Sequence, residues 1–357
     1  MNTLLLLVRR SNAQCSTPTP GGTVHPTVTR HARRIGTAAT ALLALAGTAL
    51  ATAIPANAAS YGIIVQPDQG ITPIYTLINS ATSTLDLTLY ELVDTTAEQD
   101  LVARENAGVD VRVVLDSRQK TTNQAAYTYL TDNGVGVAWS SSKYYYTHEK
   151  SFAIDGTKLV VMSGNLTTQY YSADRNYSVT DTDAADITAF ETVFDADYAG
   201  TTVTPGDGDH LVWSPTDSQS KLLALINGAK STLLVENQEM GYSTIVNALV
   251  AAAARGVSVK VVMTNSGDDY ASEFDTLTAG GVSVSTYADT ASLYIHAKAI
   301  VADYGLSSLK TFVGSQNFSS TSLNSNRELG IILTSTVVAN GVEPVIASDY
   351  SGGTIWS

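Results

Sequence analysis

An internal duplication constrains the fold of this chain more than any other feature. Residues 67–114 and 215–262 share residues at a constant offset of 148 positions, without a gap. The shared residues include Leu-Ile-Asn at 77–79 and 225–227 and Ser-Thr-Leu at 83–85 and 231–233. After a four-residue insertion near 304–310, the register continues at an offset of 152. We therefore expect two copies of one structural unit that together form the fold.

Each copy alternates helices with short apolar strands. In the second copy the pattern predicts helices over 218–227 and 244–255 and strands over 233–236 and 257–263, and in the first copy a strand over 111–115. Continuous apolar strands are typical of sheets that helices cover on both faces. The sequence thus predicts an α/β fold with halves at 61–204 and 209–357, joined by the Pro- and Gly-containing segment 201–209.

Residues 1–58 have the pattern of an export signal. Arg33 and Arg34 precede an apolar stretch at 35–54, and Ala-Asn-Ala at 56–58 matches a small-x-small cleavage site. We expect a secreted, extracellular protein, with a transmembrane anchor as the alternative. The long stretch before the basic residues is consistent with a start assigned too early, and export could follow the general or the twin-arginine route. Cys15, the single cysteine, lies in this segment, so the exported protein would have no disulfide.

The charge balance argues against a polyanionic partner. The formal net charge is −13, and removal of residues 1–58 takes away five arginines and no acidic residue, which gives −18. Such a surface repels nucleic acids and anionic membranes at long range, although a local basic pocket for one phosphate stays compatible with it. We expect a monomer without a nucleic acid partner.

One pattern, H-x-K-x-x-x-x-D, lies at equivalent places in the two copies and begins at His148 and His296. Export would leave three of the five histidines, these two and His210, and we assign no function to His210. The alternation of side chains along a strand places each histidine and its lysine on one face and the aspartate, Asp155 or Asp303, on the other. We therefore expect the aspartates to support the site rather than to react.

The residue types of this pattern suit phosphoryl transfer. One imidazole can attack while neutral, and the other, protonated, can donate to the leaving oxygen. Lys150 and Lys298 can bind the non-bridging phosphate oxygens. Asn165 and Asn317, expected in the strand that follows each motif, can donate further hydrogen bonds.

Other repeated or clustered residues could reach the same pocket. Glu91 and Glu239 occupy equivalent positions after apolar strands, where sites in α/β folds gather. The tyrosines at 144–146 could line a pocket for a lipid or a sugar, and packing against a strand explains them equally well.

Further residues accompany the twin motif: Ser-Gly-Asn at 163–165, Ser-Gln-Asn at 315–317, Arg175-Asn176 and Arg327-Glu328. Together with it they resemble the phospholipase D superfamily, over nearly all of residues 61–357. This resemblance implies two α/β/α halves packed about a pseudo-twofold axis with one shared active site. It also implies a phosphohistidine intermediate and no metal or other cofactor.

By motif position, the resemblance implies two groups of site residues. The catalytic group consists of His148, Lys150, Asp155, His296, Lys298 and Asp303. The substrate-binding group consists of Ser163, Asn165, Asn176, Ser315, Asn317 and Glu328. Because Asn176 stands where the second copy has Glu328, the two halves are chemically unequal. Resemblance to lipases of the superfamily implies that His148 is the nucleophile and His296 the acid, an order that the sequence itself leaves open.

The superfamily contains phospholipases, phospholipid synthases, nucleases and other phosphodiesterases. Synthases usually carry membrane helices, and a nuclease needs a basic track for the phosphate backbone. We therefore expect a secreted phospholipase D that hydrolyses a glycerophospholipid, preferably a zwitterionic one, to phosphatidic acid, with transient contact to a membrane surface. The alternatives are an endonuclease or other phosphodiesterase of the superfamily, and a non-catalytic phosphate-binding module.

Overall fold

A computed structural model describes residues 58–357. The expected export signal therefore lies outside the described residues, apart from Ala58. Between residues 58 and 357 no helix combines the length and the apolar character that a membrane span requires.

The two halves share a common series of helices and strands, with a few short elements that differ. The first half has strands β1 (Tyr61–Gln66), β2 (Thr84–Leu89), β3 (Leu92–Val93), β4 (Asp110–Leu115), β5 (Gly136–Trp139), β6 (Lys150–Ile154), β7 (Lys158–Met162), β8 (Leu166–Thr167) and β9 (Asp174–Asp181). Its helices are α1 (Thr72–Asn79), α2 (Thr95–Asn106), α3 (Lys120–Asp132), the 3-10 helix η1 (Thr168–Tyr170) and α4 (Ala184–Tyr198).

The second half repeats this series from residue 211 onward. Its strands are β10 (Leu211–Ser214), β11 (Thr232–Glu236), β12 (Ser258–Asn265), β13 (Ser283–Ala288), β14 (Tyr294–Ile295), β15 (Ala299–Ala302), β16 (Lys310–Gly314), β17 (Glu328–Leu333) and β18 (Thr354–Ile355). Its helices are α5 (Ser218–Gly228), α6 (Ser243–Ala254), α7 (Ala271–Ala279), α8 (Ser320–Asn324) and α9 (Thr336–Gly352). The predicted helices and strands of this half correspond to α5, β11, α6 and β12.

Seven strands have the same order in both sheets, and β18 extends the second sheet. The first sheet runs β1-β9-β7-β6-β2-β4-β5 and the second β10-β17-β16-β15-β11-β12-β13-β18. In each sheet three successive strands, β2-β4-β5 or β11-β12-β13, are parallel to one another. The motif strand, β6 or β15, lies antiparallel beside β2 or β11. The predicted α/β class and the duplication are thereby confirmed.

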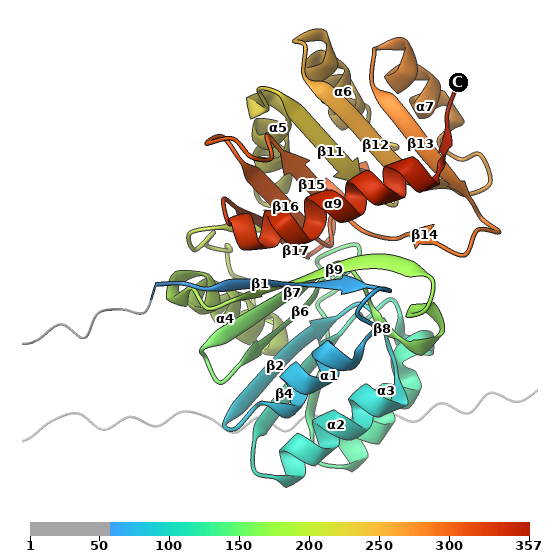
Figure 1. The fold of residues 1–357 in the computed structure, drawn as a ribbon. Helices are drawn as coiled ribbons and strands as arrows, with labels where there is room; N and C mark the ends of the chain where they lie inside the picture. Colours follow the sequence, from blue (N-terminus) through green and yellow to red (C-terminus); the bar gives the residue numbers. More distant parts are fainter. Residues whose placement is uncertain (1–57) are drawn as a thin grey trace, which may run out of the picture. The chain divides into compact units, whose positions relative to one another are not determined.

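Successive residues of the central strands enter different cores, which explains why these strands are apolar throughout. Val113 packs in the outer core of the first half, with residues of α1, α2 and α3, whereas Val114 packs in the core between the sheets. Val261 and Val262 divide in the same way. Helices α4 and α9 lie between the two sheets, while α1 to α3 and α5 to α7 cover the outer faces (Figure 1).

Two buried ion pairs join the halves at equivalent positions. Arg175, from β9, donates through Nε to Asp349 of α9 at 2.5 Å. Arg327, directly before β17, donates through Nε to Asp197 of α4 at 2.8 Å. Both arginines and both aspartates are buried. Each half therefore supplies the arginine of one pair and the aspartate of the other.

Candidate active site

Each histidine motif is attached to a strand of the opposite half. Thr147 forms an isolated parallel bridge with Arg327, and the N–H of His148 donates to the carbonyl of Arg327 at 2.9 Å. In the second half, Ile295 of β14 pairs with Arg175 of β9. These backbone bonds place both histidines at the junction of the sheets.

Each histidine is oriented by a side chain from the other half. His148 Nδ1 lies 3.0 Å from Glu328 Oε2, and His296 Nδ1 lies 2.9 Å from Asn176 Oδ1. The hydroxyl of Ser163 donates to the same Asn176 oxygen at 2.8 Å, so this oxygen accepts from both groups. An Nδ1–H donor on each ring leaves Nε2 as the atom available for chemistry.

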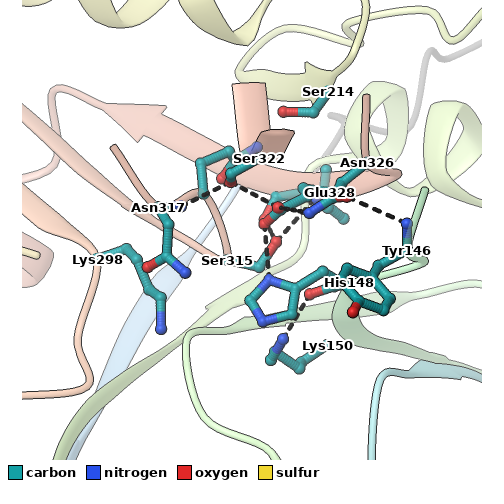
Figure 2. A network of polar contacts seen from close by, with 12 residues as sticks. Tyr146, His148, Lys150, Ser214, Lys298, Ser315, Asn317, Ser322, Asn326 and Glu328 are labelled. Carbon is teal, nitrogen blue, oxygen red and sulfur yellow. Dashed lines mark hydrogen bonds and ion pairs between the residues drawn. The ribbon is translucent and has the colours of Figure 1, made fainter. Parts of the chain in front are cut away.

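Glu328 is fully buried and held by neighbours that donate to it. Ser322 and Asn326 contact its Oε1 at 2.5 Å and 2.8 Å. Burial raises the pKa of Glu328 to about 7, against the opposing effect of Lys150. Figure 2 shows the His148 ring between Glu328 and the amine of Lys150. This arrangement fixes the ring plane and directs Nε2 away from the carboxylate.

The two lysines lie beside the histidines and are themselves buried. Lys150 Nζ donates to the carbonyl of His148 at 2.5 Å, and Lys298 Nζ to that of His296 at 2.6 Å. Burial lowers the pKa of Lys150, and it lowers the pKa of Lys298 to about 8. Burial and the two ammonium groups also lower the pKa of both histidines below the usual 6.5. A neutral His148 is the form that can attack phosphorus.

The two lysines contact different residues at one pair of equivalent positions, Tyr90 in the first copy and Gln238 in the second. Lys298 Nζ also donates to Gln238 Oε1 at 2.9 Å, whereas Lys150 Nζ lies 4.8 Å from the centre of the Tyr90 ring. The Tyr90 ring also packs edge-on against His148, with centroids 4.6 Å apart. Together with Asn176 and Glu328, this pair makes the two sides of the site chemically different.

Both histidines line one cavity of ≈ 530 Å³. A second hollow of ≈ 380 Å³ also reaches His148 but does not reach His296. His148, Tyr90, Glu239 and Asn317 line both spaces. The first cavity, which we call the acidic cavity, has four carboxylates in its wall: Glu91, Asp174, Glu239 and Asp289. Glu91 and Glu239, which follow β2 and β11 in the chain, thus both reach the site.

Two of the three asparagines of the predicted binding group, Asn165 and Asn317, line the acidic cavity. Asn317 Nδ2 donates to Glu239 Oε1 at 2.9 Å, while the buried Oδ1 of Asn165 has no hydrogen-bond partner. Both residues follow strands β7 and β16 rather than lying within them, because each strand ends at the preceding turn.

Four residues that were expected to bind substrate, Ser163, Ser315, Asn176 and Glu328, lie outside both spaces beside the histidines. All four are buried. The Ser163 and Ser315 hydroxyls accept from the backbone N–H groups of Tyr177 and Leu329. Their hydrogen bonds are made within the protein, and two of the four, Asn176 and Glu328, orient the histidines directly.

The structure places Asp155 and Asp303, which were expected in the catalytic group, in contact with the backbone at the start of a neighbouring strand. Asp155 accepts from the backbone N–H groups of Thr82, Ser83 and Thr84 at 2.7–3.0 Å. Asp303 accepts in the same way from the backbone of residues 230–232. Each aspartate follows its motif strand and fixes the start of the neighbouring strand, as the alternation of side chains predicted.

Several residues of the site were not predicted. They are Tyr90, Gln238, Ser322, Asn326, Asp197 and Asp349. Asp197 and Asp349 repeat at the offset of 152, so extending the comparison of the two copies to their last helices would have found them. The others differ between the copies, and no repeat indicates them.

One group in the described part of the chain has the spacing of metal ligands, Asp183, Asp186 and His210, and it lies near the junction of the halves. Asp186 already accepts from His210 Nδ1 at 2.8 Å and from the backbone N–H groups of Asp209 and His210. These contacts explain the group as an anchor for the segment that links the halves.

The comparisons with known proteins agree with this geometry. The family described as "cardiolipin synthase, PLD-like domain" matches residues 74–198 and 222–350, which is one match in each half. The chain belongs to the phospholipase D superfamily. Comparison with curated protein sequences finds no match.

Two solved structures share the fold at low sequence identity. Phosphatidylserine synthase of Haemophilus influenzae is 13% identical, with a TM-score of 0.63 over 83% of this chain and 87% of that one. Polyphosphate kinase of Porphyromonas gingivalis is 12% identical, with a TM-score of 0.62 over 81% of this chain and 50% of the kinase. The chain thus spans half the length of that kinase. At these identities the likeness concerns the fold alone.

Proposed function

We propose that this chain is a secreted phospholipase D that hydrolyses a glycerophospholipid to phosphatidic acid through a phosphohistidine. One observation carries the proposal. Two histidines line one cavity beside two buried lysines, and each is hydrogen-bonded through Nδ1 to a side chain of the opposite half. This arrangement supplies a nucleophile, an acid and two cations for one phosphodiester.

In the first step Nε2 of neutral His148 attacks phosphorus, and the bond between phosphorus and the headgroup oxygen breaks. His296, protonated, gives its proton to that oxygen, and the headgroup alcohol leaves. Lys150 and Lys298 stabilise the charge on the non-bridging oxygens. In the second step His296 takes a proton from water, whose oxygen attacks phosphorus and releases His148. The products are phosphatidic acid and the free alcohol.

The charge of the cavity favours a lipid with a positively charged headgroup over a nucleic acid. Four carboxylates line the cavity that contains His296, the proposed donor to the leaving group. Burial raises the pKa of Asp174, but only to about 6, so this carboxylate is still largely ionised at neutral pH. A positively charged alcohol is attracted to such a wall, whereas the successive phosphates of DNA or RNA are repelled. The net charge of −13 acts in the same direction.

The decisive assay compares phosphatidylcholine vesicles with plasmid DNA as substrates of the purified protein. We expect release of choline and phosphatidic acid, and no nicking of DNA, with His148→Ala as the inactive control. Activity should persist with EDTA present, because the lysines supply the positive charge at the phosphate. Nicking of DNA without lipid hydrolysis would replace this proposal with the endonuclease alternative.

A further inference from the structure

A third hollow, of ≈ 410 Å³, adjoins the site through Tyr145. Tyr145 lines both this hollow and the one of ≈ 380 Å³ that reaches His148. We call the third hollow the basic groove, because Arg118 and Lys143 lie in its wall. Hydroxyl and amide side chains complete the wall, among them Ser142, Asn324 and Ser325.

The two cations of the basic groove lie against aromatic rings rather than in ion pairs. The Arg118 guanidinium lies 4.6 Å from the centre of the Tyr145 ring, and Lys143 Nζ lies 5.4 Å from that of Tyr144. Within residues 58–357 neither forms an ion pair. Both side chains are exposed. In a chain of net charge −13, two free cations in one hollow form a local site for an anion.

The position of the basic groove relative to the histidines indicates what that anion belongs to. This step rests on the proposed function. His296, the proposed acid, lines the acidic cavity and neither of the other two spaces. The leaving headgroup therefore occupies the acidic cavity. We place the retained glycerol and its acyl chains, together with the lipid surface that holds them, toward the hollow of ≈ 380 Å³, which reaches His148 but not His296 and shares Tyr145 with the basic groove.

We propose that Arg118 and Lys143 bind the phosphate of an anionic lipid, such as the product phosphatidic acid, that neighbours the substrate in the membrane surface. The oxygens of a phosphate group can bind two cations and accept hydrogen bonds from adjacent hydroxyl donors. At physiological ionic strength the repulsion from distant acidic groups is screened beyond roughly 8 Å, so the local cations decide the contact. The basic groove is thus a docking site for a second lipid beside the catalytic one.

Vesicle flotation tests this proposal without requiring turnover. The full chain, with His148→Ala in every protein compared so that phosphatidylcholine is not hydrolysed, is mixed, at 0.15 M salt, with vesicles of phosphatidylcholine alone or of phosphatidylcholine with phosphatidic acid. We expect more binding to the mixed vesicles, and about 30-fold weaker binding to them for the double variant Arg118→Ala/Lys143→Ala, at roughly 1 kcal/mol per cation near an anionic surface. The control is Lys230→Ala/Lys310→Ala, which removes the same charge from exposed lysines outside the basic groove and should bind like the His148→Ala protein without further substitution.

A second readout separates this proposal from the proposed function. On a monomeric short-chain phosphatidylcholine the Arg118→Ala/Lys143→Ala variant should keep the wild-type kcat/KM, because no neighbouring lipid is present. If the wild type hydrolyses no phospholipid, the proposed function fails while flotation still reports on the basic groove. Equal flotation of the His148→Ala protein with both vesicles, or of the double variant and the His148→Ala protein with mixed vesicles, would overturn the docking site.

Discussion

His148 Nδ1 lies 3.0 Å from Glu328 Oε2, and this contact joins a histidine of the first half to a carboxylate of the second. The equivalent contact, His296 to Asn176 at 2.9 Å, runs in the opposite direction. Each histidine therefore depends on a side chain of the other half for its orientation. The two contacts differ in charge, so the two rings are chemically unequal; under the proposed function the carboxylate-supported ring, His148, attacks and the amide-supported ring donates the proton.

Replacement of Glu328 by Gln should reduce kcat by about 10²- to 10⁴-fold. The amide keeps the size of the side chain but no longer stabilises the charge that develops on His148 as it attacks. The measurement is choline release at substrate saturation, with circular dichroism to verify folding. A folded variant within threefold of wild-type kcat would show that the carboxylate does not support the nucleophile.

Replacement of Asn176 by Asp should move the basic limb of the kcat/KM profile to higher pH. His296 acts as an acid only while protonated, so activity falls as the pH rises through its pKa. Burial and the two lysines lower this pKa below 6.5. A carboxylate at position 176 would favour the protonated ring and raise the pKa, by about one to two pH units. Asn176→Ala, which adds no charge, should lose activity without this displacement, and an unmoved limb in Asn176→Asp would refute the role of His296.

Replacement of Asp155 by Asn should lower stability by about 2 kcal/mol while leaving kcat within a few-fold of the wild type. Although burial acts to raise it, the hydrogen bonds from Thr82, Ser83 and Thr84 lower the pKa of Asp155 below 3.8. Its stabilisation is therefore fully present above pH 3.8 and is lost as the pH falls toward the depressed pKa. Urea unfolding at a series of pH values should show wild type and variant converging only in acid. A large loss of kcat with unchanged stability would restore a catalytic role.

Replacement of Asp197 by Asn should destabilise the protein by about 3–5 kcal/mol, because it leaves the buried charge of Arg327 without its partner. The matched control is Asp195→Asn on the same helix. Asp195 pairs with Arg112 but its side chain is 61% exposed, so its loss should cost less than about 1 kcal/mol. The shift in urea midpoint measures both. Equal shifts would mean that the ion pair does not hold the halves together.

The features that could be predicted from sequence are those that both copies share. The offset of 148 predicted paired strands and helices, and the alternation within the motif predicted a supporting role for Asp155. The contacts that could not be predicted arise from tertiary pairing. Ser322 and Asn326 reach Glu328 from the loop and short helix before β17, and Tyr90 and Gln238 occupy one repeat position with different chemistry. No local pattern encodes such partners, because they depend on how the two sheets meet.

Mass spectrometry of quenched enzyme tests the central claim most directly. The protein is mixed with phosphatidylcholine, stopped in the steady state under conditions that preserve phosphoramidate bonds, and digested. We predict a phosphatidyl adduct on His148, absent from His148→Ala, and its interception by an added primary alcohol as the phosphatidyl alcohol. An adduct on His296 alone would reverse the roles of the two histidines. Full phospholipase activity in His148→Ala would contradict the mechanism itself.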